Sequence, residues 1–376
     1  MPHVVPNVLG PSAHGSAAWG DAAVIIPWTL YLQYGDVSLL EEQYASMRAW
    51  VEFMRNRGLV ETMNSDGFHF GDWLGLDSAP GSYVGATPID LIANAFFAYS
   101  TELLAKTAAV LGKEEDQREY EDLYRRIVEA FQNEFITPTG RLVSPTQTAY
   151  VLALWMRLVK PEHVERLVSA LEASIREHDT HLSTGFVGTP YLLHVLTRYG
   201  RIDTAYDLLL QTTYPSWLYP LSQGATTIWE HWDGIKPDGT FWSPDMNSFN
   251  HYAYGAVGEW LYRVMAGINP VEDDPGFKSI VIRPTPHSAI RWAKAAYDSL
   301  YGQIRSEWCV RDSRFELEVD IPANTTARVE FPHRALTGWT SDADGVELHQ
   351  DPDGPWLALG SGRYRFSYEI PSADLG

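Results

Sequence analysis

The chain has 376 residues, 45% of them hydrophobic, so it can bury a sizeable core, and its length predicts about two domains. Its 28 basic and 48 acidic residues give a formal charge of −20, which repels nucleic-acid phosphates and anionic lipid and argues against both as partners. The single cysteine, Cys309, excludes an intrachain disulfide and a thiolate zinc cluster. A neutral ligand fits this composition better.

The first two thirds of the chain are predicted to be helical. In DVSLLEEQYASMRAWVEFM, residues 36–54, apolar residues recur at steps of mostly three and four, the period of a helix with one buried face. The same period predicts helices near 18–34, 88–111, 114–135, 146–158, 161–177, 188–199, 202–211 and 249–266. Because no strand signal interrupts them, these helices predict an all-α domain.

Two connectors between these helices, residues 64–87 and 212–248, are long and rich in aromatic, glycine and acidic residues. Long loops of a compact domain are usually functional or disordered, and this aromatic content argues against disorder. A helical toroid with short loops on one face and functional loops on the other is the expected arrangement.

Two motifs in the first hundred residues combine tryptophan with aspartate. In AAWGDAAVIIPW, Asp21 either caps a helix or binds a ligand. Trp19 in the same motif is the better candidate for a ligand-binding residue. In FHFGDWLGLD, Asp72 and Trp73 lie in a glycine-punctuated loop where neither helix nor strand periodicity explains the tryptophan. The second motif therefore favours a binding role.

Two further motifs lie between residues 226 and 264. In TTIWEHWD, Glu230 stands between Trp229 and Trp232, and a carboxylate among aromatic walls is partly withdrawn from water, which suits proton transfer. The alternative is a glutamate that caps a helix or pairs with the neighbouring histidine. In NSFNHYAYGAVGEWLY, His251 begins an amphipathic helix, and a lone histidine is more often structural than catalytic.

After Pro270 the pattern changes to strand chemistry. Segments such as SIVIRP, YGQIRSEWCV, RFELEVDIP and YRFSYEI alternate or are rich in β-branched and aromatic residues, separated by turn residues. An antiparallel β-sandwich is predicted for residues 271–376, after a helical domain of residues 1–270. Trp292 and Trp308 are expected to pack in a core or between domains rather than to form a sugar platform.

The chain lacks a phosphate-binding glycine loop, an HExxH helix and a GxSxG elbow, and its histidines are not paired at metal-ligand spacing. No cofactor and no metal are therefore expected. What remains is a set of carboxylates and aromatic residues on loops of a helical domain, and that combination indicates glycoside hydrolysis.

In order along the chain, AWGDAAVIIPWTLYLQYGD, FGDWLG, GATTIWEHWDG, MNSFNHYAYGAVGEWLYR, PGFKSIVIRP and YGQIRSEW, followed by IPANTTARVEFP, resemble the bacterial α-L-rhamnosidases of glycoside hydrolase family 78. The resemblance covers nearly the whole chain. It implies an (α/α)6 barrel as catalytic domain, followed by a C-terminal β-sandwich, and hydrolysis of terminal α-L-rhamnosides by inversion.

The resemblance also implies roles for single residues. The general base of the family falls on Glu230, the histidine of its SFNH motif on His251, and its sugar-contacting tryptophans on Trp19 and Trp73. The acidic positions of its WGDA and GDW motifs fall on Asp21 and Asp72. Trp229 and Trp232 are expected to shape the same substrate pocket.

The chain departs from the family in one respect. The family's general acid lies in an RDE-rich segment ahead of the WGDA region, and nothing in residues 1–18 resembles it. The barrel is therefore expected to be incomplete, lacking its first helices, and the chain alone to have weak or no rhamnosidase activity. Uncovered helix faces would favour self-association, so a homo-oligomer is one expectation.

Two alternatives remain open: a non-catalytic sugar-binding remnant and another (α/α)6-barrel glycosidase, such as a trehalase-like or glucoamylase-like enzyme. The expected partner is a small-molecule or oligosaccharide rhamnoside, with no nucleic acid and no membrane. The N-terminus does not resemble a signal peptide, so a cytoplasmic location is expected, with an extracellular one the alternative if the natural N-terminus lies upstream.

Overall fold

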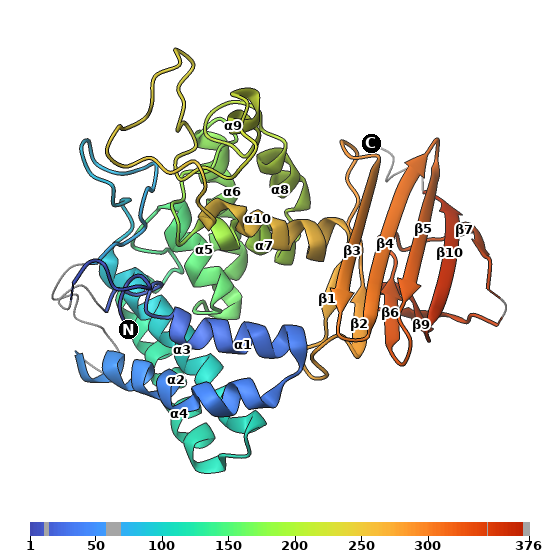
Figure 1. Cartoon of the computed structure of the whole chain (residues 1–376), viewed down its shortest axis with the longest axis horizontal. Helices are drawn as coiled ribbons and strands as arrows, with labels where there is room; N and C mark the ends of the chain where they lie inside the picture. The colour runs from blue at the N-terminus through green and yellow to red at the C-terminus, as the bar shows by residue number, and fades with distance from the viewer. Residues whose placement is uncertain (11–14, 58–68, 344, 371–376) are drawn as a thin grey trace. The chain divides into compact units, whose positions relative to one another are not determined.

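The computed structural model describes residues 1–10, 15–57, 69–343 and 345–370, in which a helical part precedes a part made of two β-sheets (Figure 1). The helices are α1 (Ala22–Tyr34), α2 (Val37–Arg57), α3 (Ile89–Val110), α4 (Glu114–Phe135), α5 (Gln147–Trp155), α6 (Pro161–Glu177), α7 (Thr189–Arg198), α8 (Ile202–Leu209), α9 (Leu218–Ser222), the 3-10 turn η1 (Ala253–Ala256), α10 (Val257–Trp260) and the π-helical turn η2 (Leu261–Met265). The predicted order, helices and then strands, is confirmed.

Three details of the helical part differ from the sequence-based prediction. The first helix begins at Ala22, four residues later than expected, because Ala18 has a left-handed φ of 67° and residues 17–21 form a turn. The last predicted helix, 249–266, starts only at Ala253 and is divided into η1, α10 and η2. The short helix α9 in the 212–248 loop was not predicted, since five residues show no periodicity.

Consecutive helices pack against each other as hairpins: α3 with α4, α5 with α6, and α7 with α8. The members of a pair differ in burial. Helix α3 is buried along most of its length, whereas α4 buries residues at steps of three and four, from Tyr120 to Phe135, and exposes its other face. Helices α5 and α6 repeat this difference. Inner and outer helices therefore alternate, as expected for a barrel of helical hairpins.

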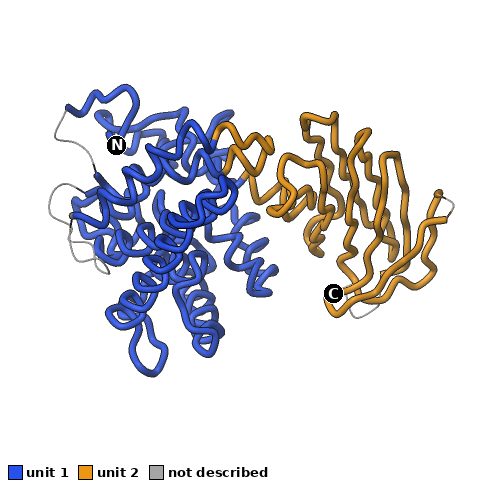
Figure 2. The backbone as a smooth tube through the Cα atoms, turned by 90° about the horizontal axis from the view of Figure 1, so that it is seen from below, with its two compact units in different colours: residues 1–28, 40–257 blue, residues 29–39, 258–376 orange. Residues whose placement is uncertain are grey.

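The chain divides into two compact units, shown in different colours in Figure 2: unit 1 is residues 1–28 and 40–257, and unit 2 is residues 29–39 and 258–376. The predicted domain limit was 270/271. Unit 2 includes the turn after α1 because the Gly276 amide donates to the Leu32 carbonyl over 3.0 Å. A Cβ on Gly276 would lie 2.9 Å from the Gly35 nitrogen, so this close approach requires glycine.

Unit 2 contains two five-stranded sheets, in the orders β1-β2-β6-β9-β8 and β3-β4-β5-β10-β7. The strands are β1 (Ile268–Pro270), β2 (Ser279–Ile282), β3 (Trp292–Ser299), β4 (Gly302–Arg311), β5 (Arg314–Ile321), β6 (Thr326–Glu330), β7 (Thr337–Ser341), β8 (Leu348–Asp351), β9 (Gly354–Leu359) and β10 (Gly362–Glu369). The predicted antiparallel arrangement holds for every described strand pair except β2 and β6, which run parallel from Ser279↔Thr326.

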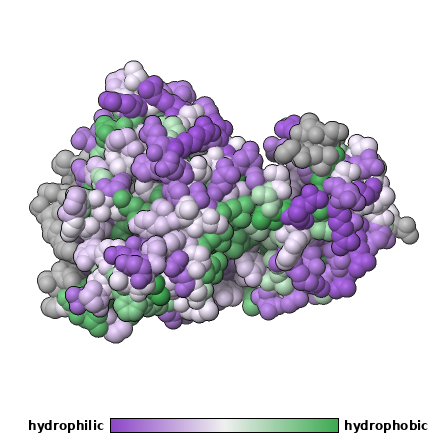
Figure 3. Space-filling view, turned by 90° about the horizontal axis from the view of Figure 1, so that it is seen from above, coloured by the Kyte–Doolittle hydropathy of each residue, from purple (hydrophilic) through white to green (hydrophobic). Residues whose placement is uncertain are grey.

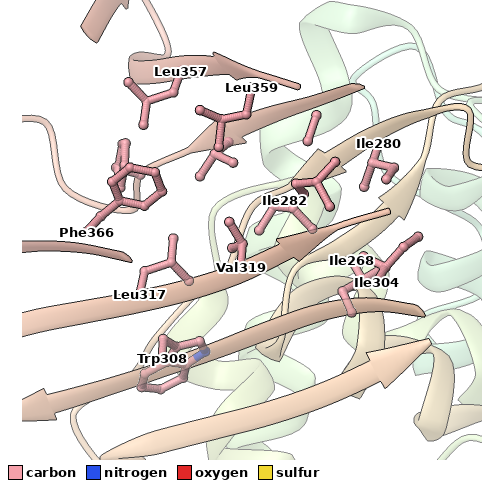
Figure 4. Close-up of a cluster of buried hydrophobic side chains, with 14 of the residues drawn as sticks. Ile268, Ile280, Ile282, Ile304, Trp308, Leu317, Val319, Leu357, Leu359 and Phe366 are labelled. Atoms are coloured by element: carbon pink, nitrogen blue, oxygen red, sulfur yellow. The ribbon is translucent and has the colours of Figure 1, made fainter. Parts of the chain in front are cut away.

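Hydrophilic side chains cover much of unit 2 on the face drawn in Figure 3, whereas its apolar side chains gather inside (Figure 4). Strands β4 and β5 alternate buried and partly exposed residues, the pattern of strands with one face on a core. Trp308 joins this core, 2% exposed, and its indole donates to the Met265 carbonyl over 2.7 Å. Trp292, by contrast, is 67% exposed, so its expected place in a core was wrong.

Candidate active site

Glu230 lies in a loop that is hydrogen-bonded to a second loop, residues 246–251. The Glu230 amide donates to the Ser248 carbonyl over 2.8 Å, and the Ser248 amide donates to the Oε2 atom of Glu230 over 2.9 Å. The His251 amide donates to the Ile228 carbonyl over 2.9 Å. Within the part of the chain that the structure describes, Oε1 of Glu230 accepts no hydrogen bond, so one oxygen is fixed and the other remains available.

Trp229 and Trp232, the predicted walls around Glu230, are buried, with 5% and 3% of their surfaces exposed. Trp229 packs edge-on against Phe249, with 5.1 Å between ring centroids. Trp232 stacks on Tyr254 at 3.9 Å and meets Trp217 edge-on. Their contacts in the structure are thus with other protein side chains, and they fix the loop that carries Glu230.

A continuous run of aromatic contacts connects three of the sequence motifs. It begins at the WGDA motif, passes the FGDW motif and ends beside Glu230, with centroid separations between 3.7 and 5.7 Å. Its members, in order of contact, are Trp19, Phe70, Trp73, Tyr83, Trp242 and His231. Trp19 and Trp73 are half-buried, so both keep surface that a ligand can reach.

Asp21 is fully buried immediately before α1. Its carboxylate accepts hydrogen bonds from the Ala18 amide at 2.7 Å, the Trp50 indole at 2.9 Å and the Ser100 hydroxyl at 2.5 Å. Burial raises the pKa of Asp21, and these three hydrogen bonds oppose the rise. These contacts tie the turn before α1 to α2 and α3 and include no amide of the first turn of α1, so Asp21 has a structural role that differs from the expected helix cap.

Asp72 is also buried, 1% exposed, and fixes two loops together. The Thr148 hydroxyl and the Gly185 amide donate to Oδ2 over 2.5 and 2.8 Å, and the Val187 amide donates to Oδ1 over 3.1 Å. Burial raises the pKa of Asp72 to about 6 in spite of these donors, and the negative charge of Asp77 adds to the rise. Its position holds the loop that carries Trp73.

Two histidines lie near Glu230. His251 stacks on Phe186, with 4.9 Å between ring centroids, and is half-buried. His231 is 5% exposed and stacks on Trp242 at 3.7 Å. Burial lowers the pKa of His231 to about 4, the Glu230 carboxylate opposes this, and His251 adds to it. His231 is therefore neutral at pH 7.

Tyr254, in the NSFNHYAYGAVGEWLY motif, connects the predicted site residues but was not itself predicted as one of them. Burial raises its pKa well above 10, and the carboxylates of Asp72, Glu230 and Asp233 raise it further. Three carboxylates from two distant parts of the sequence are thus close enough to act on one hydroxyl. Phe186, which meets Tyr254 edge-on at 5.2 Å, was not predicted because its loop lacks a chemical motif.

The described residues contain no group of three or more His, Cys, Asp or Glu side chains that could hold a metal ion. In the same part of the chain, no helix is long and apolar enough to cross a membrane.

Helical hairpins that present a loop carboxylate among aromatic side chains, followed by a β-sandwich, place the chain in the class of six-hairpin glycosidase domains. The model of the bacterial α-L-rhamnosidase six-hairpin glycosidase domain matches residues 1–265, and that of the bacterial α-L-rhamnosidase C-terminal domain matches residues 267–344. The chain belongs to the bacterial α-L-rhamnosidase family.

Individual relatives agree with this assignment. An α-L-rhamnosidase of Streptomyces avermitilis is 44% identical over 365 residues, which are 96% of this chain. The crystal structure of a Streptomyces avermitilis α-L-rhamnosidase complexed with L-rhamnose superposes with a TM-score of 0.88 at 42% identity, again over 96% of this chain. That of an Aspergillus terreus α-L-rhamnosidase gives 0.87 at 32% identity over 99%.

The chain spans about one third of the length of these relatives: 34% of the curated Streptomyces protein, 34% of the Streptomyces structure and 41% of the Aspergillus structure. The similarity therefore covers the helical hairpins and the following β-sandwich.

Proposed function

We propose that this chain carries the catalytic region of a glycoside hydrolase that removes terminal α-L-rhamnose from rhamnosides by inversion, with Glu230 as general base. The observation that supports this most directly is the state of the Glu230 carboxylate: the Ser248 amide fixes Oε2, and Oε1 accepts no hydrogen bond within the described residues. Membership in the rhamnosidase family supports the choice of sugar.

In an inverting hydrolysis, the base removes a proton from a water molecule that attacks the anomeric carbon opposite the leaving group. A carboxylate with one fixed oxygen presents the other in a defined direction, which suits it to orient that water. His231 is neutral at pH 7 and so places no positive charge beside Glu230.

The other predicted site residues take two roles in this proposal. Trp19, Trp73 and His251 are half-buried and contact the sugar, whose C–H faces stack on indole rings. Asp21, Asp72, Trp229 and Trp232 are buried and act as positioning residues, because their contacts hold the loops that carry the first group. The sugar-contacting residues are thus the partly exposed ones, and the positioning residues are the buried ones.

We further propose that the general acid does not come from the residues of this chain. An inverting enzyme needs a second carboxyl group about 6.5–9.5 Å from the base. The carboxylates that share Tyr254 with Glu230 are Asp72 and Asp233. Both oxygens of Asp72 accept hydrogen bonds from the protein, which removes it as a candidate and leaves Asp233 for the test.

The test compares two substrates, because a good leaving group needs little protonation. The chain should hydrolyse p-nitrophenyl α-L-rhamnopyranoside slowly and methyl α-L-rhamnopyranoside about 10²–10⁴-fold more slowly still, the usual contribution of a general acid. Glu230→Gln should abolish the slow reaction, whereas Glu115→Gln, on the exposed face of α4, should not change it. Proton NMR should show the β-anomer of rhamnose as the first product.

Four outcomes would contradict parts of this proposal. Equal turnover by Glu230→Gln would exclude Glu230 as the base. Efficient hydrolysis of the methyl rhamnoside, lost in Asp233→Asn, would place the acid on Asp233. Binding of L-rhamnose without any hydrolysis would favour the sugar-binding alternative, and turnover of other glycosides alone would favour another six-hairpin glycosidase.

A further inference from the structure

A groove of about 630 Å³ lies on the face of the β3-β4-β5-β10-β7 sheet that is directed away from the unit 2 core. This volume is within the usual range of about 300–1,000 Å³ for small-molecule sites. The groove crosses the strands in rows that the register defines. One row contains Trp292, Cys309 and Glu316, and the next contains Lys294, Glu307, Glu318 and Arg365.

Trp292 is the unusual member of this surface. Among the described residues it is the one tryptophan whose side chain is mainly exposed, at 67%. An indole left in water forgoes the hydrophobic stabilisation that the buried Trp308 on the neighbouring strand obtains. A flat apolar platform at the edge of a polar groove suits a ligand with both an apolar and a hydroxylated face.

The charges of the groove indicate an uncharged ligand. Its charged lining residues are three cations and four anions: Lys294, Arg311, Arg365, Glu307, Glu316, Glu318 and Asp342. They are largely paired, since Lys294 contacts Glu307 at 2.7 Å and Arg365 contacts Glu318 at 2.9 Å. A nearly balanced lining gives neither a polyanion nor a polycation an electrostatic advantage.

We propose that this groove binds a neutral oligosaccharide, one sugar of which stacks on Trp292 while the others bond to the carboxylates and guanidinium groups of the next row. The site is separate from Glu230 and holds a saccharide without cleaving it. That the sugars include rhamnose rests on the proposed function; that the ligand is a neutral saccharide rests on the groove itself.

The experiment uses the whole chain with 5-fluorotryptophan in place of tryptophan, in the Glu230→Gln background so that the probe is not cut. The 19F resonances of residues 292, 19 and 73 are assigned from the single Trp→Phe variants. An α-L-rhamnose tetrasaccharide is then titrated. We expect a saturable shift of the Trp292 resonance and a loss of affinity of about tenfold or more at this site in Trp292→Ala.

Tyr301→Ala is the matched control, since Tyr301 is an exposed aromatic residue on the β3–β4 turn, 40% exposed and outside the groove lining. Its affinity should equal that of the parent chain. A Trp292 resonance that does not move at millimolar probe, or binding that survives in Trp292→Ala, would overturn the proposal.

The resonances separate this proposal from the proposed function. Shifts of the Trp19 and Trp73 resonances, with none at Trp292, would contradict only the proposal that the groove binds a saccharide. A shift at Trp292 with none at Trp19 and Trp73 would support the groove and contradict sugar binding beside Glu230.

Discussion

The candidate site of unit 1 and the outer sheet face of unit 2 hold their carboxylates in opposite ways. In unit 1, Asp21 and Asp72 are buried and bonded only to neutral donors, and burial raises the pKa of both. In unit 2, carboxylates lie on the open sheet face beside cations. Arg363 donates two hydrogen bonds to Asp320, at 2.7 and 2.9 Å, and lowers its pKa.

The difference separates two uses of the same functional group. A buried carboxylate with amide and hydroxyl donors fixes loops in one geometry, which a catalytic site needs from the residues around its base. An exposed carboxylate paired with arginine adds little to stability but provides a surface rich in hydrogen-bonding groups. The candidate site of unit 1 therefore uses Asp21 and Asp72 for positioning, whereas the outer sheet of unit 2 presents its carboxylates to solvent.

The largest expected effect is the loss of stability in Asp72→Ala. The variant leaves the Gly185 and Val187 amides and the Thr148 hydroxyl buried without an acceptor, so the free energy of unfolding should fall by about 3–5 kcal/mol. Urea unfolding at pH 5 measures it. Glu316→Ala on the sheet of unit 2 should change the free energy by less than about 0.5 kcal/mol. Equal losses of unfolding free energy in Asp72→Ala and Glu316→Ala would contradict the contrast between buried positioning carboxylates and exposed ones.

The second prediction concerns pH. The pKa of Asp72, about 6 in the folded chain against its ordinary 3.8, means that the folded state holds this proton more tightly. Its contribution to stability is therefore fully present below pH 3.8 and is lost as pH rises through 6. The stability difference between the parent chain and Asp72→Asn should shift by about 2 kcal/mol against the parent between pH 4 and pH 7.

Asp320→Asn gives the opposite sign. Because Arg363 lowers the pKa of Asp320, its contribution is present above its ordinary pKa of 3.8 and is lost as pH falls through the lower folded value. Denaturant unfolding of the parent chain, Asp72→Asn and Asp320→Asn at several pH values gives, for each variant, the slope of its stability difference from the parent against pH. Slopes of the same sign would show that burial does not dominate at Asp72.

Much of the fold could be predicted from the sequence because helix and strand periods are local. Runs such as residues 114–135 carry their own amphipathic pattern, and the structure has a helix over the same range. The parallel pairing of β2 with β6 could not be predicted, since it depends on which strands meet across more than forty intervening residues. Trp292 was misplaced for a related reason: strand alternation does not say which face is covered.

The candidate site likewise combines residues that the sequence could predict with contacts that it could not. Trp19, Trp73 and Glu230 were marked by short motifs that combine tryptophan with a carboxylate and by the family resemblance, not by helix or strand periodicity. The contacts that connect them, through Phe70, Tyr83 and Trp242, join residues far apart in sequence and leave no local signal. Asp72 was predicted as a ligand residue from its motif, whereas its donors on the Thr148 helix and the 185–187 loop became visible only in the structure.

The smallest expected effect comes from the sheet face of unit 2. Burial raises the pKa of Glu307, hydrogen bonds from Lys294 and Arg305 lower it, and the hydrogen bonds prevail. Exposed pairs of this kind contribute about 0.2–1 kcal/mol, so Glu307→Gln should reduce the free energy of unfolding by no more than that. In 1 M NaCl, where the screening length is about 3 Å, the reduction should vanish. The loss in Asp72→Ala should persist in the same salt, because the partners of Asp72 are buried and uncharged. A loss that salt removes equally from Asp72→Ala and Glu307→Gln would show that solvent reaches Asp72 as it reaches Glu307.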